Sequence, residues 1–202
     1  RVGIFDADVY GPSLPTMLSM HRNPLTYTSE GLIEPLLYED LKCMSFGYTN
    51  PEGAAILRGP MVTQIINQLL TGTDWGECDY LIIDMPPGTG DIQLTLGQVI
   101  PMSSAVIVTT PQKISFIDVI KGIQMFDSLN IPSIAVVENM SFYECGIPKE
   151  KHFIFGKGAK KALEKEFGFQ HIFEVPIIPE VAQKSDSGVP AIKSNNTLSN
   201  IF

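Results

Sequence analysis

The sequence predicts an α/β fold with a mostly parallel sheet and helices on both of its faces. Three observations lead to this class: short β-branched runs recur along the chain, helical patterns lie between them, and the runs are continuously apolar. A strand with one wet face alternates apolar and polar residues, so continuous runs indicate strands that are buried on both faces. A chain of 202 residues can form one sizeable core, and we expect a single domain over residues 1–202.

The predicted strands are short runs rich in valine and isoleucine, bounded by turn residues or helical patterns. They cover residues 1–6, 41–48, 80–84, 105–109, 134–137 and 172–175. The run at 41–48 has the weakest strand pattern of the set. Because helical patterns separate the later runs, most neighbouring strands are expected to be parallel.

Helices are predicted over residues 62–70, 92–99, 116–129 and 159–167. The first begins just after Pro60, a residue favoured in the first turn of a helix. Its apolar residues recur at helical spacing and form one face: Val62, Ile65, Ile66, Leu69 and Leu70. Asp91 is a candidate N-cap for the second helix.

Composition limits the compartment and the partners of this chain. The net charge is −8 and the pI about 4.8, which disfavours a nucleic acid or an anionic membrane as the main partner. No apolar run approaches the length of a membrane span. Three scattered cysteines, Cys43, Cys78 and Cys145, are typical of a reducing compartment, so we expect an intracellular protein without disulfides.

Carboxylates stand at the ends of two predicted strands. Asp6 and Asp8 close the first strand, and Asp84 closes the run at 80–84. Functional groups of parallel sheets lie at these carboxyl ends, and carboxylates there suit a hydrated Mg²⁺ that shares oxygen ligands with phosphates. Each Asp taken alone also fits a simpler role as a loop or helix cap. Asp8 and Asp84 together favour the magnesium interpretation.

Several segments in order resemble the Mrp/ApbC family of MinD-like P-loop ATPases. They are DADVYGPS, ILRGPMV, DYLIIDMPPGTGDIQLTL, VTTPQKISFIDVIKG, VENMSF, FGKG and EVPIIPEVAQKSDSGVPAI. The resemblance implies a P-loop NTPase fold of the MinD/ParA/NifH type and an ATP-dependent carrier that assembles and transfers [4Fe-4S] clusters. Within the family, VENMSFYECGIPKEKHFIFGKG is most similar to the high-chlorophyll-fluorescence branch of plastid scaffolds. It therefore implies a plastid or cytosolic protein, with the mitochondrion as a further alternative.

The same resemblance implies roles for the carboxylates and the loop after the third of them. Asp84 would be the Walker B aspartate, reaching Mg²⁺ through water, and residues 88–90 would sense the γ-phosphate, with Gly88 at the nucleotide. Asp8 would orient the attacking water and Asp6 would support the metal shell. Phosphoryl transfer depends mainly on such positioning and charge neutralisation.

It further implies residues that bind the base and loops that meet a second subunit. Asn139 would bind adenine through its amide, and Pro176 would pack on the base. Without the family, Asn139 reads as a left-handed turn residue and Pro176 as a strand terminator. A homodimer would form across the nucleotide through the loops at Gly11 to Ser13, 88–91 and 111–115. The recipients of its cluster would be apo iron–sulfur proteins.

The sequence departs from the family at the phosphate-binding loop. No G-x-x-x-x-G-K-[ST] motif occurs in the 202 residues, and the Gly156-Lys157 pair reads as a turn at a helix start. Arg1 resembles the start of the family's second strand, so we expect the first strand and the P-loop upstream of it. We expect the 202 residues alone to be inactive, and ATPase activity only in a chain that carries the P-loop.

A second departure concerns the cluster. Relatives carry Cys-x-x-Cys after the ENM motif, whereas here Cys145-Gly-Ile-Pro148 has only the first cysteine. A symmetric dimer would then offer two thiolates from Cys145, so the expected cluster site is labile or incomplete. Cys43 and Cys78 read as inert thiols, and the polar residues 149–153 read as a solvated loop.

Two other function classes remain open. A ParA/MinD-type positional switch without a cluster shares the two switch regions, but the acidic charge and the non-amphipathic end of the chain count against it. A dinucleotide-dependent enzyme could use a similar sheet, but no G-x-G-x-x-G follows any predicted strand.

Overall fold

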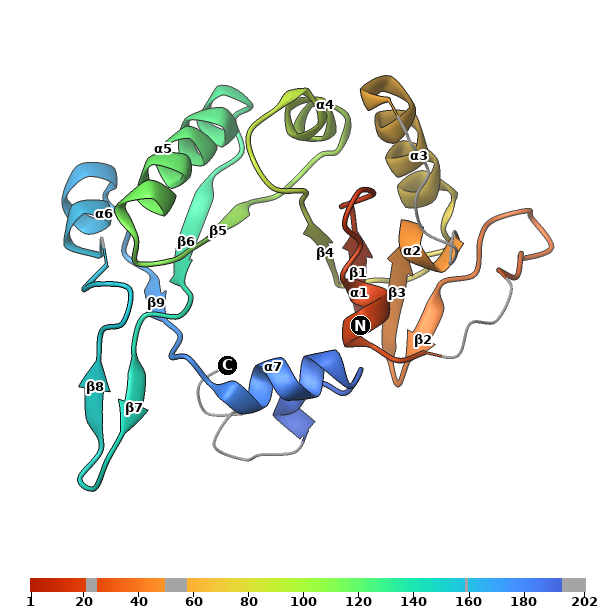
Figure 1. Cartoon of the computed structure of the whole chain (residues 1–202). Helices are drawn as coiled ribbons and strands as arrows, with labels where there is room; N and C mark the ends of the chain where they lie inside the picture. The colour runs from red at the N-terminus through yellow and green to blue at the C-terminus, as the bar shows by residue number, and fades with distance from the viewer. Residues whose placement is uncertain (21–24, 50–57, 159, 194–202) are drawn as a thin grey trace.

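The computed structural model describes residues 1–20, 25–49, 58–158 and 160–193. Their strands form three sheets (Figure 1). The first has the order β2-β3-β1-β4, from Leu36–Tyr38, Leu41–Ser45, Val2–Asp6 and Tyr80–Asp84. The second has the order β5-β6-β9, from Ala105–Thr109, Ser133–Glu138 and Ile172–Glu174. The third is an antiparallel hairpin of β7 and β8, from Tyr143–Cys145 and Glu150–His152.

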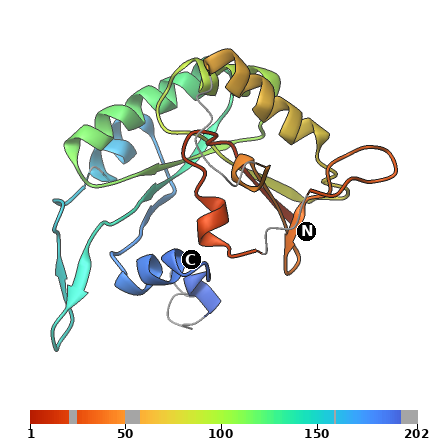
Figure 2. The ribbon, with the colours of Figure 1, turned by 45° about the vertical axis from the view of Figure 1, so that its right-hand side comes forward.

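Helices connect these strands on two sides. The ranges are α1 Leu14–Met17, α2 Phe46–Thr49, α3 Gly59–Gly72, α4 Asp91–Val99, α5 Lys113–Ser128, α6 Lys160–Phe167 and α7 Pro179–Asp186, followed by the 3-10 turn η1, Ala191–Lys193. In Figures 1 and 2, α3, α4 and α5 lie above the two larger sheets, and α7 lies below them. The helix α1 contacts α7 on that lower side. None of the helices in the described residues is both long enough and apolar enough to cross a membrane.

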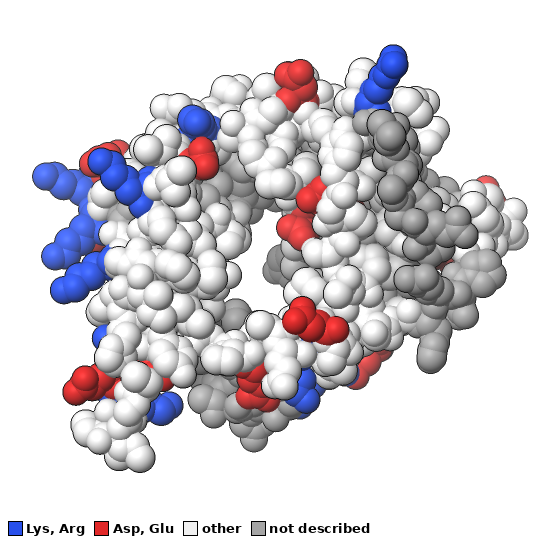
Figure 3. Space-filling model, in the orientation of Figure 1, with Lys and Arg blue, Asp and Glu red and all other residues white. Residues whose placement is uncertain are grey.

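The α/β fold with mostly parallel strands is confirmed, and the described residues divide these strands between two sheets. The neighbours β3, β1 and β4 are parallel, as are β5, β6 and β9, whereas β2 is antiparallel to β3. No pairing joins β4 to β5 in the described parts of the chain. In this view the molecule has an opening at its centre, with acidic side chains on the right-hand rim (Figure 3).

Coverage of both sheet faces is also only partly found. In β5, Ala105 and Ile107 are buried against α5, whereas Val106 and Val108 are 52% and 67% exposed. In β4, Tyr80 and Ile82 are 72% and 54% exposed. The continuous apolar runs therefore place side chains on a second face that the described helices leave open to solvent.

Two apolar cores lie under the upper helices. One packs α3 against β1 around Phe5 and Ile66, and the other packs α5 and α6 against β5 and β6 around Val136 and Leu163. Met102, just after α4, packs against both cores. The segment that connects β4 to β5 therefore also connects the two cores.

Among the differences from the predicted elements, three concern the end of a strand, a helix cap and a loop. The strand expected at 41–48 ends at Ser45, because residues from Phe46 on turn into α2. Asp91 is the first residue of α4 rather than its cap, a position that Gly90 occupies. The segment expected as a loop at 149–153 contains β8, because its backbone pairs with β7.

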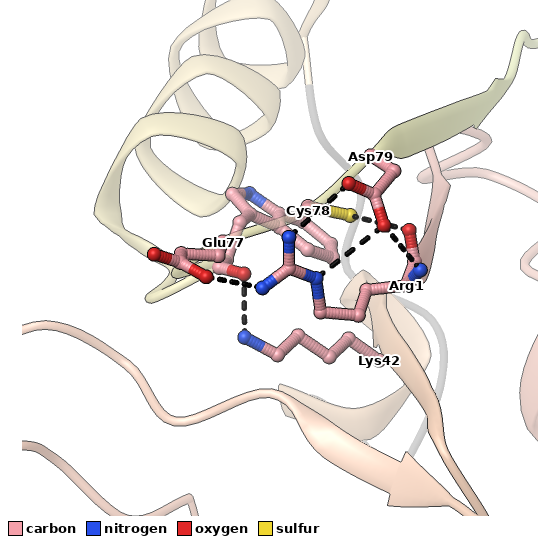
Figure 4. Close-up of polar contacts among 6 residues, drawn as sticks. Arg1, Lys42, Glu77, Cys78 and Asp79 are labelled. Atoms are coloured by element: carbon pink, nitrogen blue, oxygen red, sulfur yellow. Dashed lines mark hydrogen bonds and ion pairs between the residues drawn. The ribbon is translucent and has the colours of Figure 1, made fainter.

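Polar contacts tie the start of β1 to the chain before β4 (Figure 4). The guanidinium of Arg1 donates to both carboxylate oxygens of Asp79, at 3.3 and 3.2 Å, and also binds Glu77. The Arg1 pairing lowers the pKa of Asp79, although these exposed charges contribute little to stability. The backbone pairing of β1 with β4 starts at this point and places Asp6 opposite Asp84.

Candidate functional site: carboxylates and a switch loop at the strand ends

The carboxyl ends of β1 and β4 bring together the three aspartates singled out in the sequence. Asp6 and Asp84 are register partners on these adjacent parallel strands. Just beyond the strands, the backbone N–H of Ala7 donates to the carbonyl of Asp84 at 2.9 Å. Asp8 follows in the same loop. The expectation that parallel strand ends would gather these carboxylates is confirmed.

Asp6 is a buried anchor for the loop that follows β1. Its side chain is 1% exposed and accepts hydrogen bonds from the N–H groups of Asp8 at 3.1 Å and Leu14 at 3.2 Å, and from the Ser45 hydroxyl at 3.0 Å. Burial raises the pKa of Asp6, although these bonds oppose the shift. Asp6 therefore shapes the loop around Asp8, and its oxygens are occupied by protein donors.

The Asp8 side chain accepts hydrogen bonds from the backbone of the loop that follows β1. One carboxylate oxygen accepts from the N–H groups of Tyr10 at 3.1 Å and Gly11 at 3.0 Å, a turn that Asp commonly forms. A Cβ on Gly11 would lie 3.4 Å from the other oxygen of Asp8, which is an ordinary contact distance. The simple capping role considered for Asp8 is thus present, and it places the carboxylate beside the end of β4.

Asp84 is the exposed member of the group. Partial burial raises its pKa, and the negative charges of Asp6 and Asp8 raise it further. Such mutual repulsion favours a cation. However, the described residues contain no group of three side chains that could ligate a metal directly.

The loop after β4 is held by a residue that the sequence analysis missed. Gln93, in the first turn of α4, is 6% exposed, and its amide donates to the carbonyls of Pro86 at 3.2 Å and Pro87 at 2.6 Å. Gly88 adopts a φ of +92°, a conformation that suits glycine. The sequence signal that could have found this contact is a glutamine in the first turn of the helix, six and seven residues after two consecutive prolines.

A pocket of about 640 Å³ lies between the Asp8 loop and the loop after β4. Its lining includes Asp8, Gly11 and Gly90. It also includes Gln93, so the residue that holds the loop reaches the pocket wall. The pocket is therefore bounded by the loop of Asp8 and by the loop after β4, the two segments to which the family resemblance gives roles in phosphoryl transfer.

Asn139 and Pro176 stand at the ends of β6 and β9, in the other parallel sheet. The backbone N–H of Asn139 donates to the Thr109 carbonyl at 2.8 Å, and its side-chain oxygen accepts from Met140 at 2.9 Å. Met140, not Asn139, has the positive φ, of 56°, so the interpretation of Asn139 as a left-handed turn residue is wrong. Asn139 is exposed and Pro176 is half-buried.

Glu138 and Gly158 form a second contact that sequence reasoning missed. Glu138 is 1% exposed at the end of β6, and its carboxylate accepts a bond from the Ser141 hydroxyl at 3.2 Å. Gly158 has a φ of +68°, and a Cβ there would lie 2.1 to 2.4 Å from the carboxyl group of Glu138. The second glycine of FGKG is therefore required for the chain to pass over the strand end beside Asn139.

The cysteines lie apart from one another. Cys145 is exposed at the end of β7, opposite Glu150 of β8. Cys43 is fully buried in β3, and burial raises the pKa of its thiol to about 11. Cys78 precedes β4, at the end of the strand away from Asp84, where its thiol lies 3.8 Å from the Arg1 carbonyl (Figure 4) and 2.9 Å from the Tyr80 carbonyl. Cys145 is thus the exposed cysteine of the three, whereas Cys78 is half-buried.

The structure therefore divides the predicted site residues into three groups. Asp6, Asp8, Gly11, Asp84 and Gly88 lie together at the ends of β1 and β4. Asn139 and Pro176 belong to the other sheet, across the unpaired edges of β4 and β5, and Cys145 belongs to the hairpin.

This arrangement agrees with the comparison with known protein families. Residues 1–201 match the model of the ParA family described as "NUBPL iron-transfer P-loop NTPase". The chain belongs to this family. The predicted membership of the group of iron–sulfur carriers is confirmed.

Curated relatives in the family carry names that concern iron–sulfur clusters. "Fe-S cluster assembly factor HCF101, chloroplastic" of Arabidopsis thaliana is 54% identical over 196 residues, which is 96% of this chain and 36% of that protein. "Iron-sulfur cluster transfer protein NUBPL" of Mus musculus is 43% identical over 194 residues, or 96% of this chain and 60% of that protein. The chain thus spans about a third to three fifths of the length of these two relatives.

Solved structures of other nucleotide-binding proteins are similar to this chain in fold. A nucleotide-binding protein of Archaeoglobus fulgidus in complex with ADP superposes with a TM-score of 0.83 at 32% identity, covering 98% of this chain and 78% of that protein. The septum site-determining protein MinD of Pyrococcus horikoshii, at 16% identity and a TM-score of 0.63, shares the fold alone. The predicted MinD/ParA-like P-loop NTPase fold is confirmed.

Proposed function

We propose that this chain is the nucleotide-binding part of an ATP-dependent carrier that assembles [4Fe-4S] clusters and transfers them to apo iron–sulfur proteins. The observation that carries the proposal is the group formed by Asp6, Asp8 and Asp84 beside the glycine-containing loop held by Gln93. Carboxylates at the ends of parallel strands and a loop that can respond to a phosphate are the parts that phosphoryl transfer needs. The names of the relatives support the cluster as the cargo.

The roles within this group follow from what each oxygen contacts. Asp84, exposed and beside two other carboxylates, would hold Mg²⁺ through water. Asp8 would orient the attacking water, and Asp6 would hold the loop in place through its three hydrogen bonds. Bound Mg²⁺ would neutralise charge on the transferred phosphate. Gly11 and Gly88 would let backbone approach the phosphates.

We propose that Asn139 and Pro176 bind the adenine, since they come from adjacent strand ends that share backbone contacts. The Val175 N–H donates to the Glu138 carbonyl at 2.9 Å, which places Pro176 next to the end of β6. The amide of Asn139 offers both a donor and an acceptor to a base edge.

We propose that the complete protein has another parallel strand between β4 and β5, and that this strand leads into the phosphate-binding loop. The facing edges of β4 and β5 are unpaired among the described residues. Exposed apolar side chains lie on these strands, including Ile82 and Val108. An additional strand and its helix would cover such groups, and exposed apolar edges are otherwise prone to aggregation. The ADP-bound relative also contains residues beyond those that this chain covers.

We propose a dimer because its loops can meet a symmetric copy, and an incomplete cluster site because the number of cysteine ligands is too small. Loops at Gly11 to Ser13, Gly88 to Asp91 and Pro111 to Ser115 leave strand ends, so they can meet a symmetric copy across the nucleotide. Two Cys145 thiolates would supply half of the four ligands that a [4Fe-4S] cluster takes. Stable loading would then need ligands from another segment or from the recipient.

Met102 packs against both cores, which supports a single domain over residues 1–202. The chloroplast relative supports a plastid location, with the cytosol and mitochondrion as alternatives.

The decisive experiment measures ATP hydrolysis by two proteins. We expect no turnover from the 202-residue chain and slow turnover from the chain extended through a P-loop. In the extended chain, Asp84→Asn should reduce hydrolysis strongly because it disturbs the Mg²⁺ shell. Asp118→Asn, an exposed aspartate on α5, is the matched control and should keep the parent rate. Parent activity in the Asp84→Asn protein would remove Asp84 from the mechanism.

Cluster loading is tested separately by anaerobic reconstitution with iron and sulfide. We expect the 202-residue chain to bind a substoichiometric cluster that chelators remove easily, and Cys145→Ser to lose it. A complete, chelator-resistant cluster per dimer of this chain would contradict the incomplete site. An extended chain that hydrolyses ATP and dimerises but never takes up iron would instead favour a ParA/MinD-type switch.

A further inference from the structure

The helix α6 and the segment before it form a basic region on an acidic chain. The whole sequence has a net charge of −8, yet residues 149–167 contain six lysines and three glutamates, a local balance of +3. Figure 3 shows basic side chains gathered at the left edge of the molecule, where Figure 1 places α6. The lysines are Lys149, Lys151, Lys157, Lys160, Lys161 and Lys165.

Most of these charges are not neutralised within the structure. Lys149 lies 3.9 Å from Glu144, and Lys160 lies 3.8 Å from Glu174, both at the long end of an ion pair. The remaining lysines are exposed and form no ion pair with any residue that the structure describes: Lys151, Lys157, Lys161 and Lys165. Their charges are therefore available to a partner.

Along the chain, apolar residues lie between the lysines. Phe153, Ile154 and Phe155, in the segment from β8 to α6, are 39%, 59% and 38% exposed. Two lysines pack on aromatic rings at this place. The Lys151 ammonium lies 3.7 Å from the centre of the Phe142 ring, and the Lys157 ammonium lies 5.9 Å from that of Phe153. An apolar centre with a charged rim is the usual anatomy of a protein–protein interface.

We propose that this surface docks the acidic face of a folded protein partner. We define the docking surface as Phe153 to Phe155 together with Lys151, Lys157, Lys161 and Lys165. Charge complementarity selects the partner: opposite charges across an interface steer encounter and fix register. Glutamates at positions 150, 164 and 166 lie among the lysines, which suits a partner with a defined charge pattern. A long polyanion such as DNA or an extended anionic bilayer would also face the negative charge of the rest of the chain, whereas a short acidic segment would face only the lysines and the glutamates among them.

The position of the docking surface suggests which protein docks, and this step rests on the proposed function. The docking surface continues directly from β8, and Glu150 at the start of β8 pairs with Cys145 of β7. Phe153 follows the other end of β8, three residues beyond Glu150, so a folded partner held at Phe153 to Phe155 would lie roughly 10 Å along the hairpin from the exposed Cys145. The partner class is an apo iron–sulfur protein with an acidic docking face.

Binding is tested on the cluster-free, nucleotide-free chain, so that it does not depend on the carrier function. The probes are a short polyglutamate peptide and a second peptide in which phenylalanine replaces alternate glutamates. We expect both to bind at low ionic strength, and Lys161→Glu/Lys165→Glu to weaken binding about tenfold, since two exposed charge contacts become repulsive. The control Lys121→Glu/Lys184→Glu has the same net charge and should retain most of the affinity.

The apolar centre is tested by Ile154→Ser, since Ile154 is the most exposed of its three side chains. This change should weaken binding of the phenylalanine-containing peptide and leave polyglutamate binding unchanged. Circular dichroism checks that each variant is folded. Equal losses in the two double lysine variants, or no peptide binding, would overturn the proposal. Phosphatidylserine vesicles or duplex DNA bound as tightly, with the same dependence on Lys161 and Lys165, would also overturn it.

The outcomes for docking and for cluster transfer can be told apart. Lysine-dependent peptide binding in a protein that never loads iron would support the docking surface and refute the carrier function. Normal cluster transfer by Lys161→Glu/Lys165→Glu to an acidic apoprotein would refute the docking role and leave the carrier function standing.

Discussion

Replacing Gly158 with alanine tests the contact between the FGKG segment and the end of β6. An alanine at a φ of +68° adopts a left-handed conformation that costs about 1 kcal/mol. Its Cβ would also lie 2.1 to 2.4 Å from the Glu138 carboxyl group, far inside van der Waals contact. Glu138 is buried and bonded to Ser141, so moving it costs about a further 2 kcal/mol. We expect a total loss of about 3 kcal/mol.

Gly168 provides a matched control for the backbone cost. Its φ is +71°, and a Cβ there would meet nothing within 4 Å. Gly168→Ala should therefore cost about 1 kcal/mol from the backbone alone. For a chain of this size, the melting temperature should fall by about 2–4 °C in Gly168→Ala and by about 6–12 °C in Gly158→Ala. Thermal unfolding followed by circular dichroism measures both.

A double-mutant cycle identifies the cause of the difference. If the Glu138 carboxylate is responsible, Gly158→Ala made in a Glu138→Ala background should cost only about as much as Gly168→Ala. Equal melting temperatures for the two single glycine variants would refute the reasoning, because the contact would then add nothing to the backbone cost.

Three further predictions concern the site and the cysteines. Asp84→Asn should raise the melting temperature at neutral pH by about 1–3 °C, because it removes a charge repelled by its neighbours. The raised pKa of Asp84 means that its stabilising contribution is present at low pH and is lost as the pH rises through that pKa, so the gain should vanish in acid. Gln93→Leu should destabilise the chain by about 1–3 kcal/mol in urea unfolding and loosen the loop at Pro86 and Pro87, because two carbonyls lose their donor. A thiol reagent at mildly alkaline pH should modify Cys145 rapidly and Cys43 only after unfolding, since burial raises the Cys43 pKa to about 11.

A control variant or a contradicting outcome tests each of these three predictions. Gln98, exposed on the same helix as Gln93, should tolerate leucine with little change. Rapid modification of Cys43 in the folded protein would contradict its burial in β3. A lower melting temperature for Asp84→Asn at neutral pH would show that Asp84 makes stabilising contacts that outweigh the repulsion.

The sequence by itself determined the strands whose residues are uniformly apolar. The ranges 80–84 and 105–109 were predicted with the boundaries of β4 and β5, because short apolar runs rich in β-branched residues and bounded by turn residues are typical of strands. It also determined that Asp6, Asp8 and Asp84 would meet, since parallel strands end at one edge of a sheet. The family motifs DADVYGPS and DYLIIDMPPGTGDIQLTL contain the same three aspartates.

Only the tertiary structure decided which side chains support those residues. Gln93 reaches two proline carbonyls, Asp6 binds Ser45 of another strand, and Glu138 excludes any side chain at Gly158. Each contact joins residues that local pattern does not relate, and its energy depends on burial that exists only in the folded chain. The unpaired edges of β4 and β5 are of the same kind, because hydrogen bonding between strands depends on which segments are neighbours in space. Local periodicity carries no information about that choice.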